Sequence, residues 1–64
     1  MLFRVVLIFP DTQSLAGFVE YLAVPGEIDS RVDAFVGNLD EEQIKIARFK
    51  FGAYIRVMRI INKG

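Results

Sequence analysis

The most apolar short run of the chain lies near its start. Residues 3–9 read Phe-Arg-Val-Val-Leu-Ile-Phe, a β-branched and aromatic stretch that Pro10 ends. A run of this length and composition is typical of a strand that is buried, or nearly so, on both faces. Because such strands lie inside a sheet, we expect this segment to be central, with other elements on either side.

A helix is predicted directly after this strand. Asp11 can act as its N-cap by accepting backbone N–H groups from Gln13 or Ser14. One apolar stripe with helical spacing follows, formed by Leu15, Phe18, Val19 and Leu22. The side chains expected to point outward are Gln13, Gly17 and Glu20. The segment 24–26, Val-Pro-Gly, ends the helix and turns the chain.

Residues 27–39 allow two interpretations. Read continuously, they form one long strand; with Ser30-Arg31 as a turn, they form a hairpin with arms 27–29 and 32–37. We prefer the hairpin, because Asp29-Ser30 is turn chemistry and the first arm is short and polar, as an edge strand should be. In the second arm we expect Val32, Ala34 and Val36 on one face of the sheet and Asp33 and Phe35 on the other.

The clearest local signal is the start of a second helix. Asp40 is the expected N-cap, and Gln43 follows at the position where its side chain can bond back to the cap. Leu39 and Ile44 occupy the positions of a hydrophobic staple. The helix is predicted over residues 41–51 and is followed by Gly52 as the C′ residue.

This second helix has apolar residues on two sides. Ile44, Ala47 and Phe51 are expected to point inward. Ile46 and Phe49 point roughly the opposite way. These two residues either cover neighbouring surface or belong to a contact with another chain.

Residues 53–61 predict a final strand, followed by a frayed tail over 62–64. Its Ile55 and Val57 suit a face covered by helices, and the residues that suit the other face are Tyr54, Arg56 and Met58. The element order β-α-β-β-α-β predicts an α+β fold, a ferredoxin-like plait with an antiparallel sheet of order 4-1-3-2 and both helices on one face. The alternative is a three-stranded β-α-β-α-β arrangement.

One sheet face is therefore expected to lack helices. It should carry Arg4, Val6 and Ile8 from the first strand, Asp33 and Phe35 from the third, and Tyr54, Arg56 and Met58 from the last. Contiguous apolar surface on a small protein usually marks an interface. We predict a non-catalytic interaction or dimerisation module that uses this open face or the edge of the last strand, with Ile46 and Phe49 as further contact residues.

The composition also indicates that part of the apolar surface stays exposed unless another chain covers it. The 64 residues make one domain, 1–64, and are 53% apolar with a mean hydropathy of +0.36, which is high for a chain with so much surface per residue. The net charge is zero but divided, −3 over residues 1–39 and +3 over 40–64. Such a division would suit head-to-tail pairing of two copies. With no segment long enough to cross a bilayer, we expect a soluble, cytoplasmic protein.

A nucleic-acid alternative comes from the third strand. Residues 31–38 resemble the RNP1 motif of RRM domains at Arg31, Ala34, Phe35 and Val36. The resemblance implies single-stranded RNA or DNA binding on the sheet face, through Arg4, Phe35, Tyr54 and Arg56. It departs from the motif at Val32, Asp33 and Asn38. At Asp33 a carboxylate replaces an aromatic that would stack on a base.

Catalytic chemistry finds little support in the sequence. The chain has no cysteine and no histidine, so thiolate nucleophiles and zinc sites are excluded, and Ser14 and Ser30 have no base to activate them. The acids Glu27, Asp29 and Asp33 near the hairpin lack the spacing of a calcium loop. We therefore expect no catalytic, cofactor-binding or metal site.

Overall fold

The computed structural model describes residues 1–61. Its elements in chain order are β1 (Leu2–Ile8), α1 (Thr12–Leu22), β2 (Gly26–Asp29), β3 (Ala34–Asp40), α2 (Glu41–Phe51) and β4 (Tyr54–Ile61). The tail predicted over 62–64 lies outside the described residues. Neither helix of the described chain is long and apolar enough to cross a membrane.

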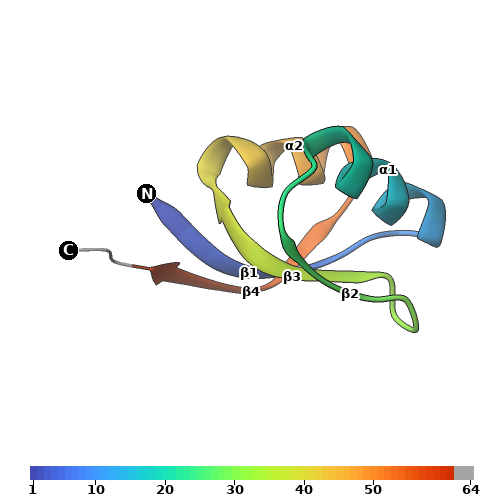
Figure 1. Ribbon diagram of the computed structural model, residues 1–64, viewed down its shortest axis with the longest axis horizontal. Coiled ribbons are helices and arrows are strands. Elements are labelled where there is room, and N and C mark those ends of the chain that lie inside the picture. The colour runs from blue at the N-terminus through green and yellow to red at the C-terminus, as the bar shows by residue number, and fades with distance from the viewer. Residues whose placement is uncertain (62–64) are drawn as a thin grey trace.

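The four strands form one antiparallel sheet in the order β2-β3-β1-β4. This is the predicted order 4-1-3-2 read from the opposite edge, and β1 is central between β3 and β4 as expected. Figure 1 shows both helices on the same side of the sheet, so the other face is left open. The fold is thus α+β with two layers.

The hairpin interpretation of residues 27–39 is confirmed: the first arm is close to the predicted 27–29, and the second arm begins later than the predicted position 32. The connecting loop spans four residues, 30–33, and β3 begins at Ala34 rather than at position 32. The Asp29 carboxylate accepts the Arg31 backbone N–H at 3.1 Å, and the Asp29 carbonyl accepts that of Val32 at 3.3 Å. These bonds extend the turn past the two residues expected for it.

Asp33 closes this loop, and the prediction that it lies on the open sheet face is wrong. It has a left-handed backbone with φ of 54°. Its carbonyl accepts the Phe9 backbone N–H at 2.9 Å, and its carboxylate accepts the Thr12 hydroxyl at 2.8 Å. Asp33 therefore connects the hairpin loop to the junction between β1 and α1.

The cap predicted for α2 is confirmed in full. The Asp40 carboxylate accepts the Gln43 backbone N–H at 2.8 Å, and the Gln43 side-chain oxygen accepts the Asp40 backbone N–H at 2.9 Å. Leu39 and Ile44, the staple residues, are both buried. Gly52 ends the helix with a left-handed backbone, φ 74°.

The N-cap predicted for α1 is also present, but one of the residues predicted to point outward does not do so. Asp11 accepts the Ser14 backbone N–H at 2.7 Å, and Leu15 and Phe18 are buried. Gly17, expected to face solvent, instead faces α2. A Cβ on Gly17 would lie 3.1 Å from Phe51 Cε1, so the missing side chain allows the two helices to approach.

The core lies between the helices and one face of the sheet. Its buried side chains are Val5, Leu7, Phe9, Leu15, Phe18, Phe35, Leu39, Ile44, Ala47 and Ala53. Phe18 is at its centre, with ring centroids 5.1 Å from Phe9, 5.3 Å from Phe35 and 6.0 Å from Phe51. The contacts of Phe18 with Phe35 and Phe51 are edge-to-face, a geometry that adds to the burial of the rings themselves.

Candidate interaction surface

The open sheet face carries the predicted side chains of β1. Arg4 is exposed, and Val6 and Ile8 are half-buried, because neither helix covers this side. Val5 and Leu7, which alternate with them, are fully buried beneath the helices. The strand is therefore buried on one face only, not on both as its composition predicted.

The prediction that Phe35 lies on the open face is wrong. Phe35 is opposite Leu7 in the β1–β3 register, and residues directly opposite in an antiparallel pair share a face. Its ring is 1% exposed and packs edge-on against Phe18. The ring also lies over two residues without side chains, Gly26 and Gly37, which leave room for it on the helix side.

β4 contains a bulge, and as a result two further side chains lie on the sheet face opposite to the predicted one. Ile55 pairs with Leu7 and Val57 pairs with Val6, so Arg56 is an extra residue with no partner in β1. An extra residue shifts the alternation of every position after it. Arg56 is exposed. Because it is the extra residue of the bulge, it does not take the regular position on the open face that was predicted for it.

The consequence is that Val57 and Met58 lie on the faces opposite to those expected. Val57, opposite Val6, belongs to the open face, and Met58, opposite the buried Val5, belongs to the helix side. Arg59 likewise falls on the open face. Tyr54, before the bulge and opposite Ile8, lies on the open face as predicted.

The two edges of the sheet differ in length and chemistry. β2, at one edge, has four residues and carries Glu27 and Asp29 on its open side. β4, at the other edge, has eight residues, six of them exposed. Its outer side has no neighbouring strand within the described chain. Short, charged edges resist pairing with other chains, whereas long apolar edges invite it.

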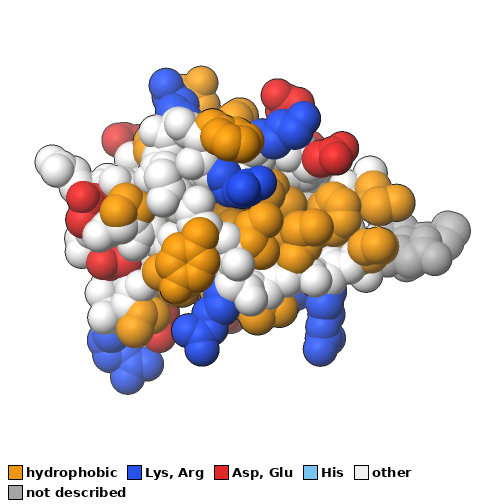
Figure 2. Space-filling model, turned by 180° about the vertical axis from the view of Figure 1, so that it is seen from behind, with side chains coloured by type: hydrophobic (Ala, Val, Ile, Leu, Met, Phe, Trp, Pro, Cys, Tyr) orange, Lys and Arg blue, Asp and Glu red, His pale blue; other side chains and the backbone are white. Residues whose placement is uncertain are grey.

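Apolar side chains are exposed on both faces of the β4 edge. On the helix side Met58 is 49% and Ile60 65% exposed, so the helices leave these two side chains largely uncovered. On the open side Val57 is also exposed. Figure 2 shows hydrophobic side chains gathered in a band on this side of the molecule, with Lys and Arg side chains projecting below them.

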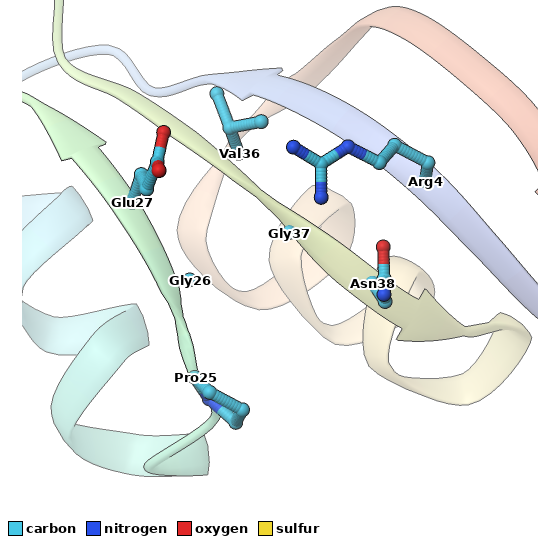
Figure 3. Close-up of a pocket in the computed structure, with 7 residues that line it drawn as sticks. All are labelled: Arg4, Pro25, Gly26, Glu27, Val36, Gly37 and Asn38. Atoms are coloured by element: carbon cyan, nitrogen blue, oxygen red, sulfur yellow. The ribbon is translucent and has the colours of Figure 1, made fainter.

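The centre of the open face is charged rather than apolar. Arg4 and Arg59 are directly opposite each other on β1 and β4. On the β2 side, a shallow hollow of about 350 Å³ is lined by Arg4, Pro25, Gly26, Glu27, Val36, Gly37 and Asn38. Figure 3 shows the Arg4 side chain extending from β1 toward β3, with Glu27 on β2 beyond that strand. The lining of this shallow hollow thus includes charges of both signs.

The two outer residues of α2 differ in exposure. Phe49 is 76% exposed, and the Arg48 guanidinium lies 5.1 Å from the centre of its ring. Ile46 is half-buried. Their part in a contact with another chain stays a prediction.

The titratable groups with shifted pKa values lie at the hairpin loop and at the N-cap of α1. The Arg31 guanidinium, 3.2 Å from the Asp29 carboxylate, lowers the pKa of Asp29, and the carboxylate raises the pKa of Arg31. The hydrogen bond from the Ser14 backbone N–H lowers the pKa of Asp11. Within residues 1–61, no three metal-binding side chains come together.

One of the two aromatic residues predicted for nucleic-acid binding, Phe35, is not on the open face. With Phe35 in the core, Tyr54 is the aromatic of the predicted set that remains on the open face. Single-strand binding relies on aromatic rings that stack on successive bases. Base stacking on this surface would therefore depend on Tyr54 alone among the predicted aromatic residues.

Sequence reasoning places Val57 on the wrong face and assigns no face to Arg59 and Ile60. All three lie after the bulge, which no glycine or proline marks. Comparison of the chain with protein-family models, with the sequences of curated proteins and with solved structures gives no match.

Proposed function

We propose that the chain is a small non-catalytic module that associates with a second copy of itself through the free edge of β4. The observation that carries the proposal is the exposure of Met58 and Ile60 on one side of this strand and Val57 on the other. A strand added at the edge would cover part of both sides at once, while pairing the free backbone groups of β4.

The scaffold for this contact is, in this proposal, a ferredoxin-like plait. The element order β-α-β-β-α-β and the strand order β2-β3-β1-β4 support it, as do the two helices on one face. In this arrangement the last strand is an edge strand, so it is available to another chain without any rearrangement of the core.

The open face is a weaker candidate for the contact than the edge. Packing two open faces together would bury Arg4 and Arg59, which are adjacent, and would cover the polar hollow beside Glu27. Burying charges without partners is costly. Pairing at the edge leaves both arginines beside solvent, so we place the contact there.

The opposite edge serves as an internal comparison. Ile28 on β2 is 51% exposed, close to the exposure of Met58. It stands on a short strand whose flanking residues, Glu27 and Asp29, are acidic. By the edge-protection argument, β2 should remain unpaired while β4 associates.

The test is the mass of the particle in solution, followed by light scattering from micromolar to millimolar concentration. We expect a dimer whose fraction rises with concentration, and we expect Ile60→Lys to make the chain monomeric. The matched control is Ile28→Lys, which places the same charge on the other edge and should leave the dimer unchanged. Far-ultraviolet circular dichroism verifies that both variants fold.

Two results would contradict the proposal. One is a chain that stays monomeric up to millimolar concentration. The other is the reverse order of the variants, in which Ile28→Lys dissociates the dimer and Ile60→Lys does not; that would move the contact to β2.

A further inference from the structure

The segment of β4 after the bulge has the same pattern in both directions. Residues 57–61 read Val-Met-Arg-Ile-Ile, two apolar residues on either side of one arginine. They pair with β1 in unbroken register, from Val57 opposite Val6 to Ile61 opposite Leu2. In an antiparallel pair of identical strands each strand meets the other's sequence reversed, so a pattern of this kind places apolar residues opposite apolar residues.

Building on the self-association proposed above, we infer that β4 pairs antiparallel with β4 of a second copy, with Arg59 on the two-fold axis. Met58 then lies opposite Ile60 of the second copy on the helix side, and Val57 lies opposite Ile61 of the second copy on the open side. All four apolar residues of the segment are matched with apolar residues, and every pair occurs twice.

The two neighbouring registers are less favourable. With Ile60 on the axis, Arg59 faces Ile61, and Ile60 with itself is the apolar match within residues 57–61. With Met58 on the axis, the apolar match within these residues is reduced to Met58 with itself, and Val57 faces Arg59. Ile60 would face Arg56, the bulged residue, where pairing is interrupted. Directly opposite side chains are the main source of stabilisation between two strands, so the register centred on Arg59 is preferred.

The preferred register also limits the strength of the contact. Arg59 lies opposite itself, and Arg4 is its neighbour on β1, so four arginines form one row across the open face. Like charges directly opposite each other are destabilising. Together with the small area that one strand edge can bury, this row predicts a weak, reversible dimer rather than an obligate one.

The charges of α2 complement this two-fold arrangement. Lys50 lies over the Tyr21 ring of α1, so that flank of α2 faces the other helix. The opposite flank, toward β4, carries Glu41, Lys45 and Arg48 at spacings of four and three. The two-fold axis sets the two α2 helices antiparallel, with the acidic start of each on the side of the basic end of the other. Such complementarity favours a second copy as the partner.

The register can be tested with single cysteines, because the chain has none of its own. Residues directly opposite have Cα atoms about 4.5–5.5 Å apart, within the range that a disulfide spans. Under mild oxidation, we expect Arg59→Cys to form a disulfide-linked dimer. The matched control is Met58→Cys, whose two copies would lie diagonally, beyond about 7 Å, and should crosslink much more slowly.

A second pair of variants tests the arginine row. Arg59→Thr removes the like-charge contact and should lower the dimer Kd several-fold by sedimentation equilibrium. Arg56→Thr removes the same charge from the bulge, away from the axis, and should change the Kd less.

The outcomes separate this inference from the proposed function. Faster crosslinking of Met58→Cys, or no crosslinking of either variant while light scattering still shows a dimer, would overturn the register and leave the self-association standing. A wild-type chain that is monomeric by light scattering would overturn both.

Discussion

The ring of Phe35 lies against Gly37, two residues further along the same face of β3. A Cβ on Gly37 would be 2.9 Å from Phe35 Cε2 and Cζ and 3.1 Å from the Pro25 carbonyl oxygen. The ring therefore occupies the space where the next side chain on this face would stand. It also fills the gap between the sheet and Phe18, so one large side chain and one missing side chain form a single packing unit.

Gly37→Ala should accordingly destabilise the fold. The added methyl group meets the Phe35 ring on one side and backbone on the other, and the ring is held by Phe18. Overpacking of this kind costs about 1–3 kcal/mol of unfolding free energy. Urea unfolding followed by circular dichroism measures the change.

Gly17→Ala is the matched control for this substitution. The new Cβ would lie 3.1 Å from the edge of the Phe51 ring, which is only half-buried and has room to move. Alanine also improves helix propensity by about 1 kcal/mol over glycine. We expect a change in unfolding free energy close to zero; a loss as large as that of Gly37→Ala would contradict this account of Phe35.

The parts of the fold that sequence reasoning found are those with local chemistry. Asp40 and Gln43 define the start of α2 because their mutual hydrogen bonds need only the residues between them. The central place of β1 follows from its own apolar run. The strand order follows once the second half of the chain is divided into a hairpin and a helix.

The residues of the candidate surface are harder to predict, because the face on which a strand residue lies depends on whether its position in the strand is odd or even. Each residue of a strand is assigned to a face by counting, and a shift of one residue reverses every later assignment. The apolar pattern of Val32, Ala34 and Val36 predicts the wrong face for Phe35, because the loop continues to Asp33 and β3 begins at Ala34. Met58 was misplaced because Arg56 is a bulge that no local residue type announces.

The end of α1 offers a second prediction. Ala23 has a left-handed backbone with φ of 52°, and its N–H donates to the Val19 carbonyl at 2.8 Å. A left-handed conformation costs an L-residue about 1–2 kcal/mol, and glycine adopts it without that cost. The greater freedom of glycine in the unfolded chain offsets about half of the gain.

Ala23→Gly should therefore raise the unfolding free energy by about 0.5–1 kcal/mol. The same substitution at Ala16, an exposed position inside α1, should lower it by about 1 kcal/mol. The opposite signs of the two changes in urea unfolding are the expected result. A destabilised Ala23→Gly variant would show that the helix does not end as described.

The third prediction concerns the acid side of the stability profile. The pKa of Asp11 is lowered from its ordinary value of 3.8, chiefly because its carboxylate accepts the Ser14 backbone N–H at the start of α1. A group whose pKa is lower in the folded state stabilises the fold above its unfolded pKa, and this stabilisation is lost as the pH falls through the folded value. The cap should thus weaken in acid.

Asp11→Asn separates the charge from the hydrogen bond. Asparagine is as good an N-cap as aspartate but does not titrate, so the variant should lose less stability than the wild type between about pH 6 and pH 2. The measurement is the urea midpoint of each protein across this range. Asp29, whose pKa is also lowered, is present in both proteins, so its contribution cancels in the comparison. Parallel pH profiles for the two proteins would contradict this prediction, because they would mean that the Asp11 charge adds nothing to the cap.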